Sequence, residues 1–382
     1  MSPRGGLLLI SRNLPPLRGG MERLNAHMAG ELAYDRGVVV LAPKGTQLPD
    51  AMNLVVRTSP LGGVAGFLIW ATFIAIVETW RHRPAWILGG SGLVAPVVWL
   101  AATVGRTRSA IYVHGLDIVV ENALYRRLWL PAIRRVTQVV ANSRNTARLA
   151  AEAGVPVGHI AVVCPGVTTP GAARADGTAF RQRHQMGDGD ILLSVGRLTA
   201  RKGLAQFVEQ ALPRILRARP GTTLVVIGDD AQDALAGHGT NERARILDIV
   251  QNLGIPSAVR MLGPVSEDDL RAAYDASTVH VFPVRDVPGD VEGFGMVAVE
   301  AAAQGLPTVA FACGGVPDAV ADGVSGRLVA AGDYVSLAEA VIGVSEAGRE
   351  AFDRPCRTFA AGFEWSIFGN KMRAILPRAE VT

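Results

Sequence analysis

Residues 191–204 have the sequence ILLSVGRLTARKGL, and this stretch decides the fold class of the chain. The apolar run Ile191–Val195 contains no strict polar alternation, which predicts a parallel strand covered on both faces. A basic loop flanked by glycines, 196–203, follows it, and segment 204–216 then repeats apolar side chains at helical spacing. A strand, a loop and a helix in this order predict one unit of a parallel α/β sheet.

The same alternation of short apolar runs and amphipathic segments continues in both directions along the chain. Further strands are predicted in the second half at 223–227, 259–262, 279–282, 308–311 and 327–329. In the first half they are predicted at 7–11, 38–42, 86–88, 110–113, 139–141 and 160–163. The pattern predicts two doubly wound, Rossmann-like domains with parallel sheets, and ligands of such sheets bind beyond the carboxyl ends of the strands.

The chain has 382 residues, which is too long for one ordinary core and suits two domains of similar size. Its composition shifts toward Gly, Pro, Ala, Asp and Thr between the two halves, as in Pro170-Gly171 and Asp188-Gly189. We therefore predict two domains facing across a cleft, with these bounds: a first domain at 1–170, a linker at 171–188, a second domain at 189–360 and a C-terminal helix at 361–382.

The bulk composition narrows the class of protein. Apolar residues make up 49% of the chain and charged ones 19%, which excludes a disordered chain. The net charge of +4 indicates anionic partners such as phosphates or anionic lipids, and does not suffice to predict nucleic acid binding. Three widely spaced cysteines predict neither a disulfide framework nor a metal site, and we expect reduced thiols in a cytoplasmic protein.

Two stretches of the first half raise the question of contact with lipid. Segment 60–77 is uncharged and nearly as long as the roughly 20 residues that a spanning helix needs. A span would cut the predicted sheet in half, so we favour a buried or surface-lying helix. A basic aromatic stretch, 125–135, adds the cations and rings that suit an anionic membrane surface, although a solvated helix face is slightly favoured for the arginines alone. The preferred hypothesis is a peripheral membrane protein on the inner face of the cell membrane.

The basic loop 196–203, which follows the predicted strand 191–195, predicts an anion-binding site. Clustering cations at the carboxyl end of a strand is costly unless an anion neutralises them. Arg197 can bind a diphosphate through two hydrogen bonds, and Lys202 can act as a point charge. Arg201 is interpreted as a residue of the exposed loop surface.

A second loop, 291–300, has the sequence VEGFGMVAVE. Gly293 and Gly295 allow close approach of the backbone to a ligand at the start of a helix, whose unpaired amides form a phosphate site. At about 1.5 Å per residue, the backbones of Glu292 and Glu300 are expected roughly 12 Å apart, beyond the roughly 5–9.5 Å of a glycosidase pair. The two carboxylates would then bind the two ends of a long ligand. A helix with an N-terminal acidic residue and a solvated Glu300 remains an equal alternative.

Two loops of the first half carry weaker signals. The turn containing Gly19 and Gly20 leads into a helix but does not form a dinucleotide-binding fingerprint. His114 and Asp117 follow a predicted buried strand and are suited to contact a sugar or to carry a proton. A lone histidine is more often structural.

Taken together, these motifs resemble the retaining GT-B glycosyltransferases of family 4. In the second half the resemblance rests on Arg197 with Lys202-Gly203, on Glu292 through Glu300, on Leu262-Gly263-Pro264-Val265, and on the glycine-rich segments 314–318 and 322–326. In the first half it rests on 18–22, His114-Gly115, 141–143 and 165–167. The likeness covers nearly the whole chain and includes bacterial mannosyltransferases.

The resemblance implies a role for each matching residue. Arg197 and Lys202 would bind the donor diphosphate without a divalent metal or other cofactor, Glu292 would contact the transferred sugar, and Glu300 would hold the ribose. His114 would face the sugar near the reacting centre. The remaining donor-binding residues would be Gly19, Gly20, Val265, Gly293, Phe294, Gly295 and Met296.

The predicted function is retaining transfer of a hexose, with mannose from GDP-mannose ahead of a UDP-sugar. The acceptor would be a lipid-linked molecule or a glycan in cell-surface polysaccharide or glycolipid synthesis. A nucleotide-sugar epimerase and a non-catalytic sugar-nucleotide binding protein remain alternatives.

Overall fold

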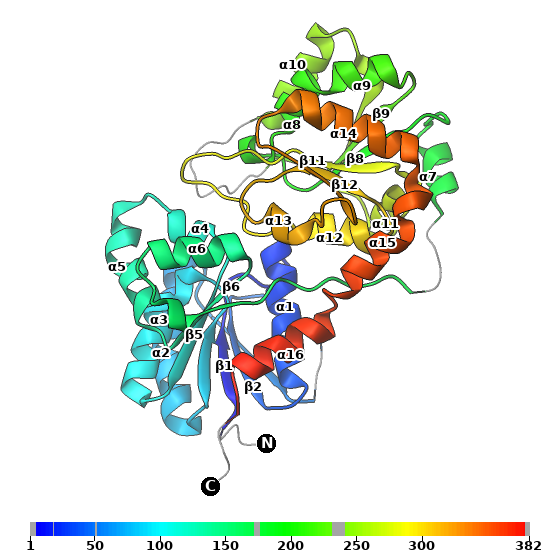
Figure 1. The fold of residues 1–382 in the computed structure, drawn as a ribbon. Coiled ribbons are helices and arrows are strands. Elements are labelled where there is room, and N and C mark those ends of the chain that lie inside the picture. Colours follow the sequence, from blue (N-terminus) through cyan, green and yellow to red (C-terminus); the bar gives the residue numbers. More distant parts are fainter. Residues whose placement is uncertain (1–4, 18, 50–51, 172–175, 231–240, 379–382) are drawn as a thin grey trace. The chain divides into compact units, whose positions relative to one another are not determined.

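The computed structural model describes residues 5–17, 19–49, 52–171, 176–230 and 241–378. The chain folds into two compact α/β units (Figure 1). Unit 1 contains Met1–Gly166 together with Trp365–Thr382, and unit 2 contains Val167–Glu364. Each unit is built on one parallel sheet with helices on both faces, so the predicted fold class is confirmed.

In the part of the chain that the structure describes, the sheet of unit 1 contains seven parallel strands in the order β3-β2-β1-β4-β5-β6-β7. They are β1 (Leu7–Ile10), β2 (Val38–Ala42), β3 (Leu54–Thr58), β4 (Trp86–Gly89), β5 (Arg108–Val113), β6 (Gln138–Ala141) and β7 (Ile160–Val162). Alternate residues of a strand point to opposite faces. Leu7 and Leu9 therefore join one core, while Leu8 and Ile10 join the other.

The helices of unit 1 complete these two cores. On one face lie α1 (Gly20–Ala33) and α16 (Trp365–Ile375). On the other face lie α2 (Gly63–His82), α3 (Ala95–Gly105), α5 (Ala123–Arg135) and α6 (Arg144–Glu152). The short helix α4 (Leu116–Val119) follows β5. Tyr112 on β5 is fully buried, and its hydroxyl donates a hydrogen bond to the carbonyl oxygen of Val163 at 2.6 Å.

Across its described residues, the sheet of unit 2 contains six parallel strands in the order β10-β9-β8-β11-β12-β13. They are β8 (Ile191–Val195), β9 (Thr223–Ile227), β10 (Val259–Gly263), β11 (Val279–Phe282), β12 (Thr308–Phe311) and β13 (Gly326–Val329). The central pair, β8 and β11, carries the two loops from which the sequence predicts the donor site. Their carboxyl ends meet at one edge of the sheet because the strands are parallel.

Helices cover both faces of the sheet of unit 2 (Figure 1). The helices α7 (Gly177–Arg183), α11 (Glu267–Ala276) and α12 (Met296–Ala303) share a core with the strands, and α15 (Arg349–Ala361) packs on α12. The opposite face carries α8 (Leu204–Gln210), α9 (Leu212–Ala218) and α14 (Tyr334–Ala347), which pack on one another. Two further helices are α10 (Glu242–Asn252), which packs on α8, and α13 (Val316–Ala319).

The bounds of the units differ from the predicted domain bounds. The predicted linker 171–188 contains helix α7, which packs on α11 and buries Phe180 completely in the core of unit 2. Residues 167–170 and 361–364 belong to unit 2, whereas α16 belongs to unit 1 and packs on α1. A composition rich in glycine and proline marked the boundary region, but the buried ring of Phe180 and hydrogen bonds of Gly177 and Arg181 to the segment 275–276 attach most of it to unit 2.

Two elements also differ from expectation. The predicted helix 204–216 is interrupted at Ala211, since Pro213 has no amide hydrogen to continue the first helix and instead lies in the first turn of α9. Strand β3 was not predicted because it is an edge strand with exposed positions, including Arg57, and lacks a continuous apolar run.

Helix α2 corresponds to the apolar segment 60–77. It is the one helix among the described residues with the length and apolar composition to cross a membrane, a test that core helices of soluble proteins also pass. Phe67, Ala71 and Ala75 are buried against the sheet of unit 1, and α2 packs along α3. The helix is therefore a covering element of unit 1 with one face left exposed.

Candidate active site

The loop after β8 carries two adjacent cations on the 3₁₀ turn Ala200–Lys202. The turn ends at Gly203, whose φ is +70° and where a Cβ atom would lie 2.1 Å from the carbonyl oxygen of Pro283. Glycine meets both conditions, so the turn packs closely against the loop that follows β11. The carbonyl oxygen of Arg201 accepts a hydrogen bond from the backbone N–H of Arg285 at 2.8 Å, which fixes the same contact.

The loop that carries Glu292 is held by a second glycine turn. The backbone N–H of Gly315 donates to the carbonyl oxygen of Glu292 at 2.8 Å. Gly314 has φ +55°, and a Cβ atom there would lie 2.7 Å from that oxygen. The loop ends at Gly295, with φ +103°, and α12 begins at Met296. The turn Gly314-Gly315 therefore fixes the backbone that presents the glutamate.

These two loops meet in an ion-pair cluster formed by Arg201, Lys202, Asp290 and Glu292. The Lys202 Nζ lies 2.7 Å from Glu292 Oε2, and the Arg201 guanidinium also contacts that oxygen. The Arg201 Nε donates to Asp290 Oδ1 at 2.9 Å. Only 13% of the Arg201 side chain, 19% of Lys202 and 12% of Glu292 are exposed, so these charges are stabilised mainly by one another.

The cluster keeps Glu292 ionised. Burial disfavours its charged form, but Arg201, Lys202 and their hydrogen bonds outweigh burial and lower the pKa of Glu292 to about 2. Burial lowers the pKa of Lys202, and the Glu292 charge opposes that change. A buried carboxylate that stays charged can accept hydrogen bonds from hydroxyl groups. The adjacent cations can bind phosphate oxygens.

Two aromatic side chains of β11, Phe282 and His280, lie near the lysine. The Lys202 Nζ lies 4.6 Å from the ring centre of Phe282, within the range of a cation–π interaction. His280 on the same strand is completely buried, and its Nδ1 forms a hydrogen bond with Thr308 Oγ1 at 3.0 Å. Burial, with a contribution from the Lys202 charge, lowers the pKa of His280 to about 3, so this histidine is neutral.

The structure reverses the expected exposure to solvent of the two arginines of the basic loop, Arg197 and Arg201. Arg197, expected to bind directly beyond the strand, is exposed to solvent. Arg201, expected on the exposed loop surface, is buried in the ion-pair cluster. Sequence reasoning therefore missed Arg201 and Asp290. The available signal was an Arg-Lys pair with two acidic residues, Asp290 and Glu292, in the next glycine loop, but only the fold shows that these loops meet.

The other predicted donor residues of unit 2 lie around the same loops. Helix α12 starts at Met296, so residues 292–295 do not follow the rise of an α-helix. The expected spacing of about 12 Å between the backbones of Glu292 and Glu300 assumed a helical rise for all of these residues, and that assumption is wrong. Glu300 lies in the second turn of α12 and is half-buried. Val265 follows β10 and packs against the core of unit 2. Gly293 and Phe294 are buried within the loop itself.

The remaining predicted residues belong to unit 1. Gly19 and Gly20 form the start of α1, and a Cβ atom on Gly19 would lie 2.3 Å from Glu22 Oε2. His114 follows β5, and its Nε2 lies 2.9 Å from the carbonyl oxygen of Gly90. The backbone N–H of His114 donates to Asp117 Oδ2 at 3.0 Å. Within unit 1, His114 is thus held by hydrogen bonds on both its ring and its backbone.

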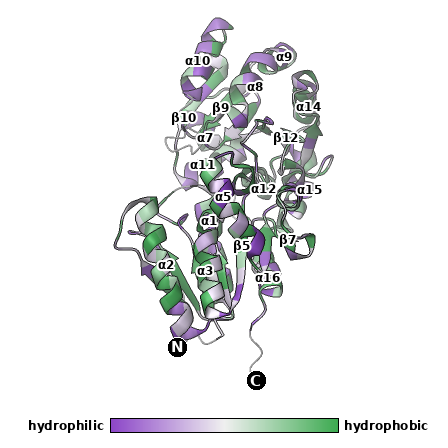
Figure 2. Ribbon diagram, turned by 90° about the vertical axis from the view of Figure 1, so that its left-hand side faces the viewer, coloured by the Kyte–Doolittle hydropathy of each residue, from purple (hydrophilic) through white to green (hydrophobic). Residues whose placement is uncertain are grey.

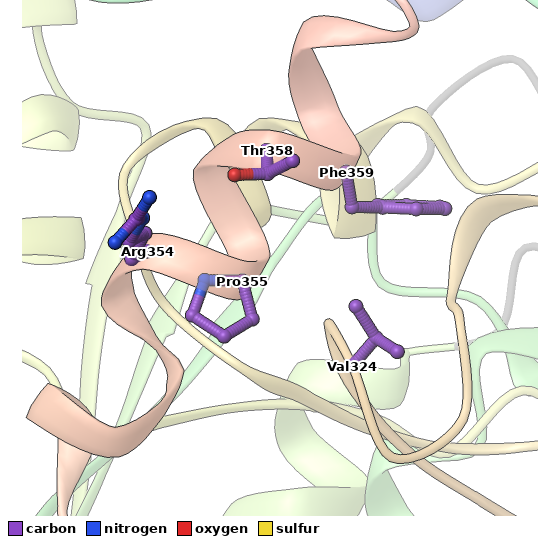
Figure 3. Close-up of a pocket in the computed structure, with 5 residues that line it drawn as sticks. All are labelled: Val324, Arg354, Pro355, Thr358 and Phe359. Carbon is purple, nitrogen blue, oxygen red and sulfur yellow. The ribbon is translucent and has the colours of Figure 1, made fainter.

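A pocket of unit 2 lies apart from the predicted residues. Its volume is about 370 Å³, and it is lined by Val324, Arg354, Pro355, Thr358 and Phe359 (Figure 3). Four of these side chains come from α15, and the lining is mainly apolar. Since it contains none of the charged residues of the two loops, the pocket is not the candidate active site.

Within the described residues, no group of three or more histidine, cysteine, aspartate or glutamate side chains is arranged to hold a metal ion. The pair Asp229-Asp230 follows β9, and Asp230 Oδ1 accepts a hydrogen bond from the backbone N–H of Arg243 at 3.2 Å. This pair forms part of a strand-end loop.

Family models match both units. Residues 18–169 match the model described as Glycosyltransferase Family 4, and residues 176–354 match the model described as Glycosyl transferases group 1. The two matches cover the loop of Gly19 and Gly20, the His114 loop and the ion-pair cluster.

Relatives with similar sequences are named as glycosyltransferases as well. A GDP-mannose-dependent alpha-(1-6)-phosphatidylinositol monomannoside mannosyltransferase of Mycobacterium tuberculosis is 28% identical over 380 residues, covering 94% of this chain and 93% of the relative. A D-inositol 3-phosphate glycosyltransferase of Nocardiopsis dassonvillei is 32% identical over 259 residues, covering 65% of this chain and 58% of the relative.

Solved structures share the fold. Anabaena Alr3699/HepE in complex with UDP matches with a TM-score of 0.76 and 20% identity over 97% of this chain and 99% of that chain. Sucrose-phosphate synthase from Thermosynechococcus elongatus matches with a TM-score of 0.78 and 20% identity over 97% of both chains. With two parallel-sheet units, both family models and these relatives in agreement, the chain belongs to the family 4 glycosyltransferases of the GT-B fold.

Proposed function

We propose that this enzyme transfers a hexose from a nucleotide diphosphate sugar to an acceptor hydroxyl with retention of anomeric configuration. The observation that carries the proposal is the buried contact of Lys202 Nζ with Glu292 Oε2 at 2.7 Å, beside the start of α12. A diphosphate would be neutralised by Lys202, Arg197 and the first amides of α12. Glu292 would accept hydrogen bonds from the sugar hydroxyls, and Glu300 would bind the ribose.

This arrangement supports the departure of the nucleotide. The bond between the anomeric carbon and the phosphate oxygen breaks, and negative charge develops on the diphosphate. Cations already in place stabilise that charge without reorganisation at the moment of reaction. In front-face attack, the acceptor oxygen forms its bond on the side that the phosphate leaves, and the acceptor proton passes to the leaving phosphate oxygen. The roles of His114, Gly19 and Gly20 remain predictions from the family resemblance.

The donor is proposed to be GDP-mannose, ahead of a UDP-sugar. The mycobacterial relative is named as GDP-mannose-dependent, whereas the Anabaena structure is a complex with UDP. A screen of GDP-, UDP- and ADP-sugars, each with and without added acceptor, tests the proposal. We expect nucleotide release that depends on the acceptor and is fastest with GDP-mannose.

The same screen separates the two alternatives. Epimerisation of the donor without an acceptor would indicate a nucleotide-sugar epimerase. Binding of the donor without turnover would indicate a non-catalytic binding protein. Either result would overturn the proposed transfer.

We further propose that the acceptor is lipid-linked and that unit 1 binds the inner face of the cell membrane through α2 and α3. Ile69, Phe73 and Trp80 lie on one side of α2 with 68–78% of each residue exposed. Leu100 and Val104 are exposed one turn apart on α3. Figure 2 shows the two helices side by side, each carrying hydrophobic residues along its length.

Basic residues border this apolar face. The C-terminal ends of α2 and α3 are adjacent, since a Cβ atom on Gly105 would lie 2.1 Å from Thr79 Cγ2. Four exposed arginines cluster around these ends: Arg81, Arg83, Arg106 and Arg108. Cations beside exposed apolar side chains suit an anionic lipid surface. Helix α5, which contains the predicted basic stretch 125–135, adds exposed Leu124 and Leu128 with Arg126 and Arg127.

Flotation with liposomes tests the membrane proposal. We expect the protein to float with vesicles of phosphatidylglycerol and phosphatidylcholine and to remain behind with pure phosphatidylcholine. The double variant Ile69→Ser/Phe73→Ser should lose flotation. Tyr34→Ser serves as the control, because Tyr34 is 82% exposed at the end of α1, on the other face of the sheet. Failure of the wild type to bind, with full activity on soluble acceptors, would refute the proposal.

A further inference from the structure

Glu292 has two cationic partners, although one suffices to neutralise it. Its Oε2 accepts from both Lys202 and Arg201. In the proposed function, Lys202 binds the donor diphosphate, which competes for the same ammonium group. If Lys202 were the sole partner, Glu292 would then remain buried with an uncompensated charge, an arrangement that destabilises proteins strongly.

Arg201 forms a second ion pair, with Asp290, in addition to its contact with Glu292. The Arg201 Nε donates to Asp290 Oδ1 at 2.9 Å, so the guanidinium joins Asp290 and Glu292. The planar guanidinium suits two carboxylates at once, whereas a lysine ammonium is a point charge on a flexible stem. Lys202 rests on the ring of Phe282 and can exchange Glu292 for a phosphate without breaking a second ion pair. Arg201 would have to leave Asp290 as well.

We propose that Arg201, anchored by Asp290, is a positioning residue that holds the Glu292 carboxylate in place for the hydroxyl groups of the donor sugar while Lys202 binds the diphosphate. This inference rests on the proposed function. It divides the two neighbouring cations by ligand: Lys202 acts on the diphosphate, and Arg201 acts on the sugar through Glu292.

This division of roles between Arg201 and Lys202 predicts different binding defects for the variants Arg201→Ala and Lys202→Ala. Affinities for GDP and GDP-mannose, and for UDP and UDP-glucose, are measured by calorimetry. Arg201→Ala should weaken binding of the nucleotide sugar roughly 10- to 100-fold, the range expected when hydrogen bonds of a charged group are lost. Binding of the free nucleoside diphosphate should weaken less, because it loses no contact with a sugar hydroxyl and is affected only by the competition of Glu292 for Lys202. Lys202→Ala should weaken both ligands.

Kinetics and pH dependence separate positioning from a merely structural role. The activity of Arg201→Ala should fall at a higher pH than that of the wild type as the solution is acidified, because Arg201 helps to lower the pKa of Glu292. Arg201→Lys should restore part of the activity by restoring the charge. Asp290→Asn, which keeps Arg201 but weakens its anchor, should raise KM for the nucleotide sugar with little loss of nucleoside diphosphate affinity.

Thermal unfolding of each variant shows whether it is folded. If Arg201→Ala does not fold, Arg201→Lys and Asp290→Asn still test the inference. If the Arg201 variants lost equal affinity for GDP and for GDP-mannose, the inference would be overturned, because Arg201 would then bind the diphosphate itself. Unchanged binding and kinetics in all three variants would also overturn it. Absence of acceptor-dependent transfer by the wild type would refute the proposed function instead, a result independent of these comparisons.

Discussion

At the scale of single residues, the chemistry of this enzyme centres on a buried carboxylate with two cations. Glu292 is 12% exposed and ionised because Arg201 and Lys202 outweigh its burial. The two cations differ in their second contact, an aromatic ring for Lys202 and Asp290 for Arg201. Adjacent residues of like charge thus have different surroundings, which is the physical basis for giving them different roles.

Lys202→Ala should lower kcat/KM at least ~100-fold, a magnitude typical of removing one group that stabilises developing charge. The variant should fold normally because Arg201 still pairs with Glu292. Steady-state kinetics and circular dichroism measure the two effects. Lys371→Ala, which removes an exposed lysine of α16, is the control and should behave as the wild type. Wild-type activity of Lys202→Ala would refute the role of this residue.

Stability should depend on pH through Glu292. Its pKa is lowered from 4.5 to about 2 in the folded protein, so the ionised group stabilises the fold above about pH 4.5 and this contribution is lost as the pH falls toward 2. Glu292→Gln should be less stable than the wild type at pH 7, and the difference should narrow between pH 4.5 and 2. Denaturant unfolding across that range measures it, and a constant difference would contradict the assigned ion pairs.

At the scale of elements, glycine turns bring the loops of β8, β11 and β12 together. Gly203 holds the cationic turn against Pro283, and Gly314 and Gly315 hold the backbone of Glu292. In each case a side chain would collide with a carbonyl oxygen, so the glycines determine where the charged residues lie.

Gly203→Ala should therefore destabilise unit 2 by roughly 2–4 kcal/mol, combining a strained φ with overpacking. Gly221→Ala is the matched control: Gly221 has φ +86°, but its Cβ atom would meet nothing within 4 Å. That variant should lose only about 1–2 kcal/mol from backbone strain. Urea denaturation compares the two, and equal losses would show that contact with Pro283 is not tight.

At the scale of the whole molecule, the chain forms two units, and its last described helix returns to the first of them. Phe368, Met372 and Leu376 are buried in the core that α1 forms with the sheet of unit 1. The Arg36 guanidinium donates to the carbonyl oxygen of Leu376 at 2.5 Å, and Trp86 Nε1 donates to that of Pro377 at 2.9 Å. Unit 1 is thus completed by residues from both ends of the chain.

Each unit should lose stability separately when its own core is damaged. Phe368→Ala should cost roughly 3–5 kcal/mol, the usual loss for a buried phenylalanine. Hydrogen exchange should increase in β1, β2 and α1 and remain unchanged in β8 and β9. Phe207→Ala, at a fully buried position of α8, should give the opposite pattern. Increased exchange in both units with either variant would contradict independent cores.

The sequence alone predicted the elements that are specified by residues close together in the chain. Continuous apolar runs predicted β8 and most other strands, since a strand buried on both faces requires them. Glycine and charge spacing predicted that the loops at 196–203 and 291–300 carry the candidate site. Edge strand β3 and the break at Ala211 were missed, because the first has little burial and the second depends on a single proline.

Neighbouring residues were therefore enough to predict the two parallel α/β units and the residue types of the site, because strand burial and loop composition depend on local sequence. Which residues act together depends on contacts between distant parts of the chain. Arg201 and Asp290 are 89 positions apart, and their pairing exists only because β8 and β11 are neighbours in the sheet. For the same reason the arginine buried beside Glu292 is Arg201, whereas Arg197, placed near the end of the strand, is exposed.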